Sequence, residues 1–473
     1  MIIDDGGGGA LTVEVEDPLQ ISGSLNITSG TLDVVNGENN QISIGVNFSS
    51  GWTNSDTFTP RLGTVVFESG GGTINNGSSD FYNVTFNDGT WSPLTSTMTV
   101  TNDLLMKGGT FDTSSGTADV TVNGNVQCDT TCGTINMTST NTFTQSVATA
   151  KNFGTNVAVG TSWTFYNLAF QSSSGTPTIT FNGTGTGDII VQNNLSLTNN
   201  GTSLVVDNET NDRMLDVNGN VTIGAGATLQ ASSSASFTVG GDWTNNGDFT
   251  DGTGTVTLDG TAQQTLSGQM TGISDRFYNL TVTNAGTANP VVVFSVSAET
   301  ANTFLANTAN TQLQFLAGGT YTFQNIDFNG QATSTRVSLR SSSTGTQWNI
   351  NVAGTRSVSN TSVRDSYACG QPPDIDASDG TNSDASNNDC WLINSLSFSI
   401  SDVSIGFGDL STSAATWATA DETGSASATA AHNLQVATNA DNGYVITYNG
   451  STLSSGSNTI NAATFTGDTD GTP

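Results

Sequence analysis

Residues 239–258 read VGGDWTNNGDFTDGTGTVTL, and this stretch decides the fold because a distant part of the chain repeats it. Residues 52–67, which begin 191 positions before Trp243, read WTNSDTFTPRLGTVVF. Both stretches start with Trp-Thr-Asn, carry a Phe six positions after the Trp, and contain Gly-Thr-Val before a final Phe or Leu. Matching offsets over sixteen residues indicate an internal repeat, which is characteristic of solenoids and other repeat folds.

Two shorter phrases support the repeat. Phe-Tyr-Asn followed by an apolar residue occurs at 81–86, 165–170 and 277–282, with a weaker Phe-Gln-Asn copy at 323–328. Val-Asn-Gly-Asn-Val at 217–221 is followed 22 residues later by Val-Gly-Gly-Asp-Trp, and a third copy lies at 122–126. The spacing predicts a unit near 20 residues, with insertions of uneven length between units.

Within each unit, the local hydrophobic period is two. Polar and apolar residues alternate at 97–101, 119–122 and 255–258, as in strands with one buried and one solvated face. Gly, Asn and Asp interrupt the strands every few residues and supply turns. These features predict an all-β fold, a right-handed parallel β-helix or solenoid of 16–18 coils, on the order of 80 Å long. An array of β-sandwiches is the competing arrangement.

The composition excludes several classes of function. The chain has 473 residues, 40 acidic and 9 basic side chains, and a net charge of −31. So few bases cannot form the positive stripe that neutralises phosphates, which excludes a nucleic-acid binder. No apolar run is long enough for a transmembrane segment. The single histidine, His432, excludes chemistry that needs several imidazoles.

Changes in composition and in the pattern of polar and apolar residues divide the chain into three parts. Residues 1–364 are predicted to form the solenoid, and residues 365–391 an acidic loop or cap closed by a disulfide. Residues 392–473, in which alternation resumes in a different style, are expected to form a smaller and incomplete β-sandwich domain.

The repeated Trp-Thr-Asn…Phe…Gly-Thr-Val phrase, followed by Phe-Tyr-Asn-Leu-Thr, resembles the repeats of large bacterial cell-surface proteins of the adhesin or autotransporter-passenger type. The segment from Asp365 to Trp391 is similar to the end of such a solenoid, and the chain from Leu396 to a β-domain that follows it. The resemblance implies a solenoid body at the cell surface and transfers no catalytic residue.

Four cysteines suggest two disulfides. Cys128 and Cys132 could close a small loop, and Cys369 and Cys390 could close the acidic segment. An even number of cysteines in a chain of secreted character favours disulfides and an oxidising compartment. A zinc site or buried free thiols are the alternatives.

The acidic segment is also a candidate calcium site, and no other cofactor is expected. Calcium prefers six to eight oxygen ligands from a flexible loop. Five oxygen-bearing side chains fall within eleven residues, and the alternative is a solvated turn region: Asp374, Asp376, Asp379, Asn382 and Asp384.

Two other groups of residues have both a functional and a structural interpretation. Arg336, Arg340, Arg356 and Arg364 form the only basic cluster, which is either a polysaccharide-cleaving site or surface charge. The Phe-Tyr-Asn copies are either a sugar-binding ladder or core. Because Tyr82 alternates with Val84 and Phe86, we expect it to share their buried face.

Together these observations predict a non-catalytic, extracellular structural or adhesive cell-surface protein: a stalk, a surface-layer component or a fibre subunit. The expected partners are further copies of the chain, neighbouring surface proteins or glycans. The alternative is a β-helix protein that binds or cleaves polysaccharide.

Overall fold

The computed structural model divides into two compact units, Met1–Ile393 and Asn394–Pro473. It describes residues 1–7, 10–94, 97–113, 116–128, 131–154, 162–182, 187–393, 396–411, 413–414, 416–438, 444–446, 454–455 and 458–459. Across these residues the secondary structure is all β, and no helix that could cross a lipid bilayer is present.

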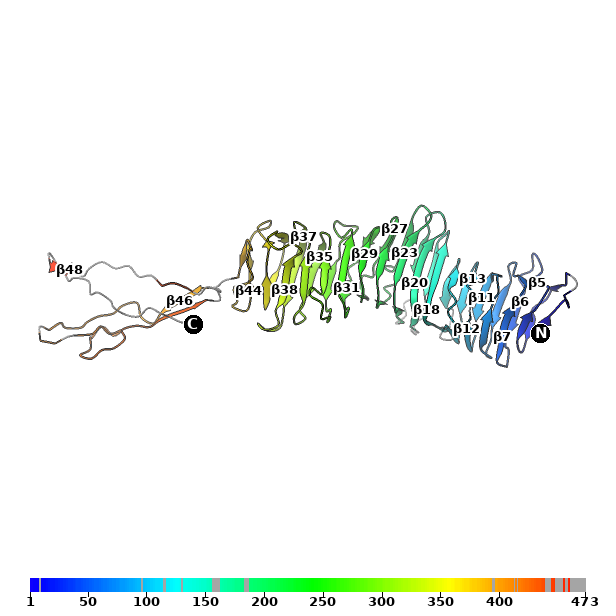
Figure 1. The fold of residues 1–473 in the computed structure, drawn as a ribbon, viewed down its shortest axis with the longest axis horizontal. Helices are drawn as coiled ribbons and strands as arrows, with labels where there is room; N and C mark the ends of the chain where they lie inside the picture. The colour runs from blue at the N-terminus through cyan, green and yellow to red at the C-terminus, as the bar shows by residue number, and fades with distance from the viewer. Residues whose placement is uncertain are drawn as a thin grey trace. The chain divides into compact units, whose positions relative to one another are not determined.

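The first unit is a solenoid of about 16 turns, which confirms the predicted fold class (Figure 1). At roughly 4.8 Å per stacked strand, it extends on the order of 75 Å. A typical coil carries three short strands, such as β22 (Ile189–Val191), β23 (Leu195–Asn199) and β24 (Leu204–Asp207). Each pairs in parallel with its equivalent on the next coil, here β25 (Leu215–Val217), β26 (Val221–Ile223) and β27 (Ala227–Gln230).

Within the described ranges, the strands of the first unit belong to four sheets. The largest sheet has 29 strands: β1 (Ile2–Ile3), β4 (Leu25–Ile27), β7 (Ser50–Asn54), β10 (Gly72–Asn75), β12 (Thr90–Pro93), β13 (Met98–Val100), β15 (Thr110–Asp112), β16 (Val120–Val122), β18 (Thr134–Val147), β20 (Trp163–Ser172), β22 (Ile189–Val191), β23 (Leu195–Asn199), β25 (Leu215–Val217), β26 (Val221–Ile223), β28 (Ser236–Val239), β29 (Trp243–Asn245), β31 (Thr255–Leu258), β32 (Gln264–Gly268), β33 (Asn279–Val282), β34 (Val292–Phe294), β35 (Glu299–Ala306), β36 (Gln312–Phe315), β37 (Thr320–Asn329), β38 (Val337–Ser341), β39 (Trp348–Val352), β40 (Arg356–Ser359), β41 (Thr361–Val363), β42 (Ser366–Tyr367) and β44 (Ser383–Asp384).

The second sheet has eleven strands: β3 (Leu19–Ile21), β6 (Gln41–Ile44), β9 (Thr64–Phe67), β11 (Asn83–Phe86), β14 (Leu104–Met106), β17 (Val126–Cys128), β19 (Lys151–Gly154), β21 (Thr178–Phe181), β24 (Leu204–Asp207), β27 (Ala227–Gln230) and β30 (Asp248–Thr250). The two smaller sheets are β2 (Thr12–Val15), β5 (Thr31–Val34) and β8 (Thr57–Thr59), and the pair β43 (Ile375–Asp376) and β45 (Trp391–Leu392).

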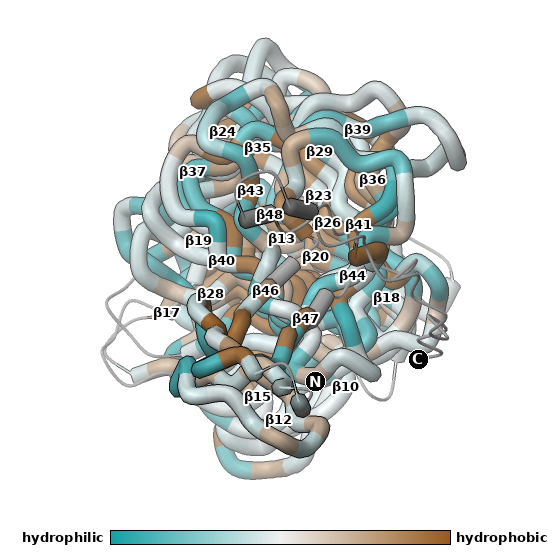
Figure 2. The backbone as a smooth tube through the Cα atoms, turned by 90° about the vertical axis from the view of Figure 1, so that its left-hand side faces the viewer, coloured by the Kyte–Doolittle hydropathy of each residue, from teal (hydrophilic) through white to brown (hydrophobic). Residues whose placement is uncertain are grey.

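Alternate side chains point inward and form one continuous core. β22, β25, β26 and β31 all show buried residues separated by half-exposed ones, and apolar and polar segments alternate along the chain (Figure 2). Parallel pairing stacks inward residues on their equivalents, as Leu215, Phe237, Val256 and Leu280 do on successive coils. Each coil therefore gains its core from its neighbours, which is the energetic logic of a repeat protein.

The repeated phrases meet in the core as aromatic trios. Trp243 lies 4.9 Å from Phe249 and 5.3 Å from Phe277, measured between ring centroids. The equivalent trio near the N-terminus is Trp52, Phe58 and Phe81, in which the Trp52 ring lies 4.8 and 5.2 Å from the other two. The Trp-Thr-Asn and Phe-Tyr-Asn phrases are thus two halves of one packing unit, which explains why they recur together.

The Phe-Tyr-Asn phrase marks a corner of the coil. In β20, residues before the corner pair with β22 and residues after it pair with β23. The alternation shifts there, so that Phe81 is buried whereas Tyr82 is half-exposed. The expected burial is confirmed for Val84 and Phe86 and is wrong for Tyr82, because two consecutive outward residues make the bend.

The corner asparagine bonds to the next coil. Asn279 Oδ1 accepts hydrogen bonds from Asn302 Nδ2 at 2.9 Å and from the backbone N–H of Thr303 at 3.3 Å. Asn167 makes the same pair of contacts with Asn193 and Asn194. These bonds satisfy backbone donors at the corner, where the strand ladder is interrupted.

The acidic segment 365–391 contains short strands that pair in parallel with the preceding coils and with each other. β42 pairs in parallel with β39, β44 pairs with β41, and β45 pairs with β43. Ile375, Ala377 and Ile393 are no more than 2% exposed and extend the core. Burial of these apolar side chains stabilises an ordered conformation in a segment that is rich in acidic residues.

The second unit contains small antiparallel sheets. β46 (Leu396–Ile400) pairs with β47 (Leu434–Thr438), and β48 (Ser454–Ser455) pairs with β49 (Asn458–Thr459). Most of residues 439–473 lie outside the described part of the chain, so the β-sandwich predicted for 392–473 stays a prediction.

Candidate functional site

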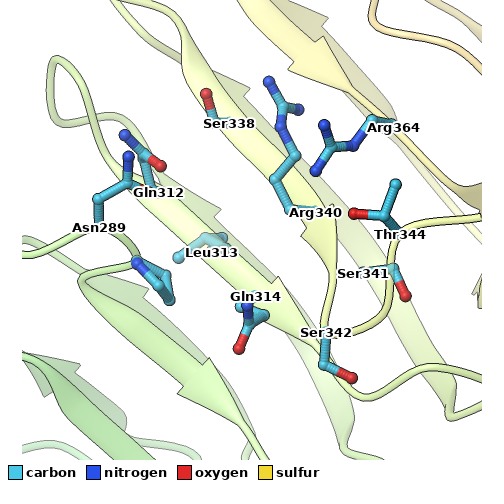
Figure 3. A pocket seen from close by; sticks show the side chains of 11 residues that line it. Asn289, Gln312, Leu313, Gln314, Ser338, Arg340, Ser341, Ser342, Thr344 and Arg364 are labelled. Carbon is cyan, nitrogen blue, oxygen red and sulfur yellow. The ribbon is translucent and has the colours of Figure 1, made fainter.

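A polar groove of about 460 Å³ on the solenoid is the candidate functional site. Residues of β36 and β38, together with the turns beside them, form it, as Figure 3 shows. The lining residues are mostly amides and hydroxyls around two arginines: Asn289, Pro290, Gln312, Leu313, Gln314, Ser338, Arg340, Ser341, Ser342, Thr344 and Arg364.

The stacking of coils brings the two arginines together. Gln314 of β36 pairs with Arg340 of β38, and Leu339 pairs with Val363 of β41. Arg340 follows Leu339 as Arg364 follows Val363, so the arginines occupy equivalent positions on successive coils. Their guanidinium groups lie close to each other (Figure 3).

The surrounding coil holds Arg340 in place. Its Nη1 donates to the carbonyl oxygen of Ser362 at 2.6 Å and to that of Leu339 at 2.9 Å, and its Nη2 donates to Ser362 Oγ at 2.9 Å. Burial and the positive charge of Arg364 lower the pKa of Arg340, and the negative charge of Asp365 opposes this. Hydrogen bonds thus orient the guanidinium group of Arg340, and Asp365 neutralises its positive charge only in part.

Arg364 is anchored by a buried carboxylate. Its Nε lies 3.4 Å from Oδ2 of Asp365, whose side chain is 2% exposed, while the Arg364 side chain is 36% exposed. Asp365 Oδ1 accepts hydrogen bonds from the Gly345 N–H at 3.1 Å and from Asn387 Nδ2 at 2.7 Å. The terminal nitrogens of Arg364 point toward Arg340 in the groove (Figure 3).

The arrangement can bind an oxyanion together with hydroxyl groups. Guanidinium groups match the geometry of carboxylate and sulfate oxygens, while amide and hydroxyl side chains hydrogen-bond neutral polar groups. Among the described residues that line the groove, none is Asp, Glu or His, the types that supply general acid and base catalysis.

The other two arginines of the predicted basic cluster lie elsewhere. Arg336 Nε donates to the carbonyl oxygen of Thr381 at 2.7 Å, and Arg356 Nη2 donates to the carbonyl oxygens of Val352 and Gln371. Neither lines the groove. The one sequence feature that indicated the proximity of Arg340 and Arg364 was their spacing of 24 residues, which corresponds to one coil.

The predicted calcium ligands are engaged in local turns. Asp376 accepts from the N–H and hydroxyl of Ser378, and Asp379 accepts from the N–H and hydroxyl of Thr381. Hydrogen bonds from Ser378 lower the pKa of Asp376. Asp384 Oδ1 accepts from the Ser386 N–H at 2.9 Å.

The other two predicted calcium ligands are Asn382 and Asp374. Asn382 is buried and bonds to the Thr361 N–H and the Ala377 carbonyl, a structural role. Asp374 is exposed. In the described ranges, no three His, Cys, Asp or Glu side chains cluster in a way that could hold a metal ion, and calcium binding stays a prediction.

The four cysteines form two pairs at disulfide distance. The Cα atoms of Cys128 and Cys132 are 5.0 Å apart, and those of Cys369 and Cys390 are 5.1 Å apart. The second pair spans 21 residues, one coil, and therefore joins successive turns of the solenoid.

Comparison of the chain with protein families, curated proteins and solved structures finds no significant match.

Proposed function

We propose that the chain is an extracellular structural or adhesive protein whose solenoid serves as a stalk at the cell surface. One observation supports the proposal most: a single core runs without interruption from Ile3 to Ile393, built from parallel coils. Such a body holds its two ends apart along one axis, with stability that adds up between neighbouring coils. Surface-layer or fibre assembly, through contacts between copies or with neighbouring proteins, is the corresponding partner proposal.

The cysteine pairs favour the extracellular compartment. Disulfides persist in oxidising environments and are rare where thiols are kept reduced. Outward Thr, Ser and Asn side chains on the strands keep the coil soluble with few charges, as at Thr222, Thr244 and Ser267.

The test is surface labelling of intact cells of the source organism with antibodies raised against residues 1–393. We expect labelling without permeabilisation, together with cysteines that react with a maleimide only after reduction. Labelling that requires cell lysis, or thiols that react freely in the protein as isolated, would contradict the proposal.

The alternative of a polysaccharide-cleaving enzyme has less support. A glycosidase positions a pair of carboxylates about the scissile bond. The groove offers arginines, amides and hydroxyls instead, which is a chemistry of recognition.

A further inference from the structure

We propose that the groove between Arg340 and Arg364 binds an acidic saccharide, with a carboxylate or sulfate held by the two guanidinium groups. This inference goes beyond the stalk function and can fail while that function stands.

The groove concentrates positive charge in a chain that is otherwise strongly acidic. The chain has nine basic residues and a net charge of −31, yet two of its seven arginines occupy equivalent positions on adjacent coils. Like charges opposite each other on neighbouring strands are destabilising. Arg364 forms an ion pair with the buried Asp365, whereas the hydrogen bonds of Arg340 within the described part of the chain go to neutral oxygens of Leu339 and Ser362, and Asp365 offsets its charge only through space. An oxyanion between the guanidinium groups would relieve this repulsion.

Amide and hydroxyl side chains surround the two arginines in the groove. The preceding coil presents Gln312 and Gln314, and the coil of Arg340 presents Ser338 (Figure 3). Side chains two positions apart on one strand share a face, so these groups and the arginines form an outward array over adjacent coils. Amides and hydroxyls both donate and accept, as sugar hydroxyls require.

The acidic character of the whole chain limits the class of ligand that the groove can bind. The many acidic residues elsewhere repel a densely charged polyanion at low salt. The groove is therefore suited to a saccharide in which charged sugars are separated by neutral sugars. The same repulsion disfavours nucleic acid.

The experiment measures binding of short saccharides to the whole chain by isothermal titration calorimetry at about 0.15 M salt, where the Debye length is about 8 Å. The probes are a tetrasaccharide in which galacturonic acid alternates with galactose, the same tetrasaccharide with sulfated galactose in place of galacturonic acid, and the uncharged galactose tetrasaccharide. Sodium sulfate and sodium acetate test whether the anion alone suffices. We expect at least one charged tetrasaccharide to bind at least tenfold more tightly than the uncharged one and than either salt.

Two variants test the site. Arg340→Gln keeps the Arg364–Asp365 contact, and the chain itself carries glutamine at the equivalent position of the preceding coil, Gln314. Gln314→Glu leaves both arginines intact and adds a negative charge to the groove. Each is expected to weaken binding of the charged saccharide at least tenfold.

The matched control is Arg276→Gln, because Arg276 pairs with Asp251 outside the groove, at 3.1 Å. It should bind as the unmodified chain does, and melting temperatures should show that all three variants are folded. Equal affinity for charged and uncharged saccharides, equal affinity for the simple salts, or unchanged binding by Gln314→Glu would each overturn the proposal. Preference between the carboxylated and sulfated probes identifies the oxyanion.

Discussion

Substituting phenylalanine for single tryptophans should destabilise the chain by different amounts at two core positions. Trp163 and Trp243 are both 1% exposed. The indole N–H of Trp163 donates to the carbonyl oxygen of Gly133 at 3.0 Å. The indole nitrogen of Trp243 is buried without a hydrogen-bond partner among the described residues, as is that of Trp52 in the equivalent trio.

The magnitude follows from this difference. In both variants the lost ring volume costs packing energy of similar size. Trp163→Phe also leaves the Gly133 carbonyl without its indole donor, at a cost of about 1–3 kcal/mol, whereas Trp243→Phe removes a buried donor that was already unsatisfied. We therefore expect Trp163→Phe to be less stable than Trp243→Phe by about 2 kcal/mol.

The assay is urea-induced unfolding followed by far-UV circular dichroism, because tryptophan fluorescence changes with the substitution itself. Trp91→Phe is the matched control, since the Trp91 indole donates to the carbonyl oxygen of Glu68 at 2.9 Å, and it should resemble Trp163→Phe. Equal stabilities, or a less stable Trp243→Phe, would refute the reasoning.

Replacing Cys369 and Cys390 by serine should lower the unfolding free energy by about 3 kcal/mol, because the disulfide closes a loop of one coil. Melting curves of the variant and of the oxidised unmodified chain should show this loss. Identical curves would mean that coil stacking alone stabilises the C-terminal end of the solenoid. Burial raises the pKa of Asp275 in the folded state above its pKa in the unfolded state. The free energy of unfolding therefore falls as pH rises from the unfolded-state pKa through the folded-state pKa, because the buried carboxyl becomes charged. Asp275→Asn should accordingly stabilise the chain at pH 7, with a smaller gain as pH falls toward 4, and a gain independent of pH in paired melts would contradict this. Asn279→Leu removes the corner acceptor for the Thr303 N–H and should cost about 1–3 kcal/mol in urea unfolding; a loss below about 0.5 kcal/mol, the range of ordinary surface substitutions, would show that the corner bond is dispensable.

Much of the fold could be predicted because its rules are local. Alternation of polar and apolar residues determines which side chains face the core, and it predicted the strands at 97–101 and 255–258. The alternation did not predict the corner at Tyr82, because the shift of face depends on where the coil bends. It also did not predict that residues 365–391 stack on the coils before them.

The candidate site was predictable only in part. The sequence indicated a basic cluster, and the structure retains two of its four arginines in one groove. Gln312, Gln314 and Asn289 carried no signal, since amides are abundant throughout the chain. Their role depends on lying beside the arginines on adjacent coils.

By itself, the sequence determined that this chain forms stacked β-coils with apolar residues inside, because a period of two and frequent turn residues act over a few positions at a time. Only the tertiary structure decided which residues of successive coils lie side by side. Coil length varies from unit to unit, so the register that joins Arg340 to Arg364, or Trp243 to Phe277, follows from how each insertion is accommodated around a shared core.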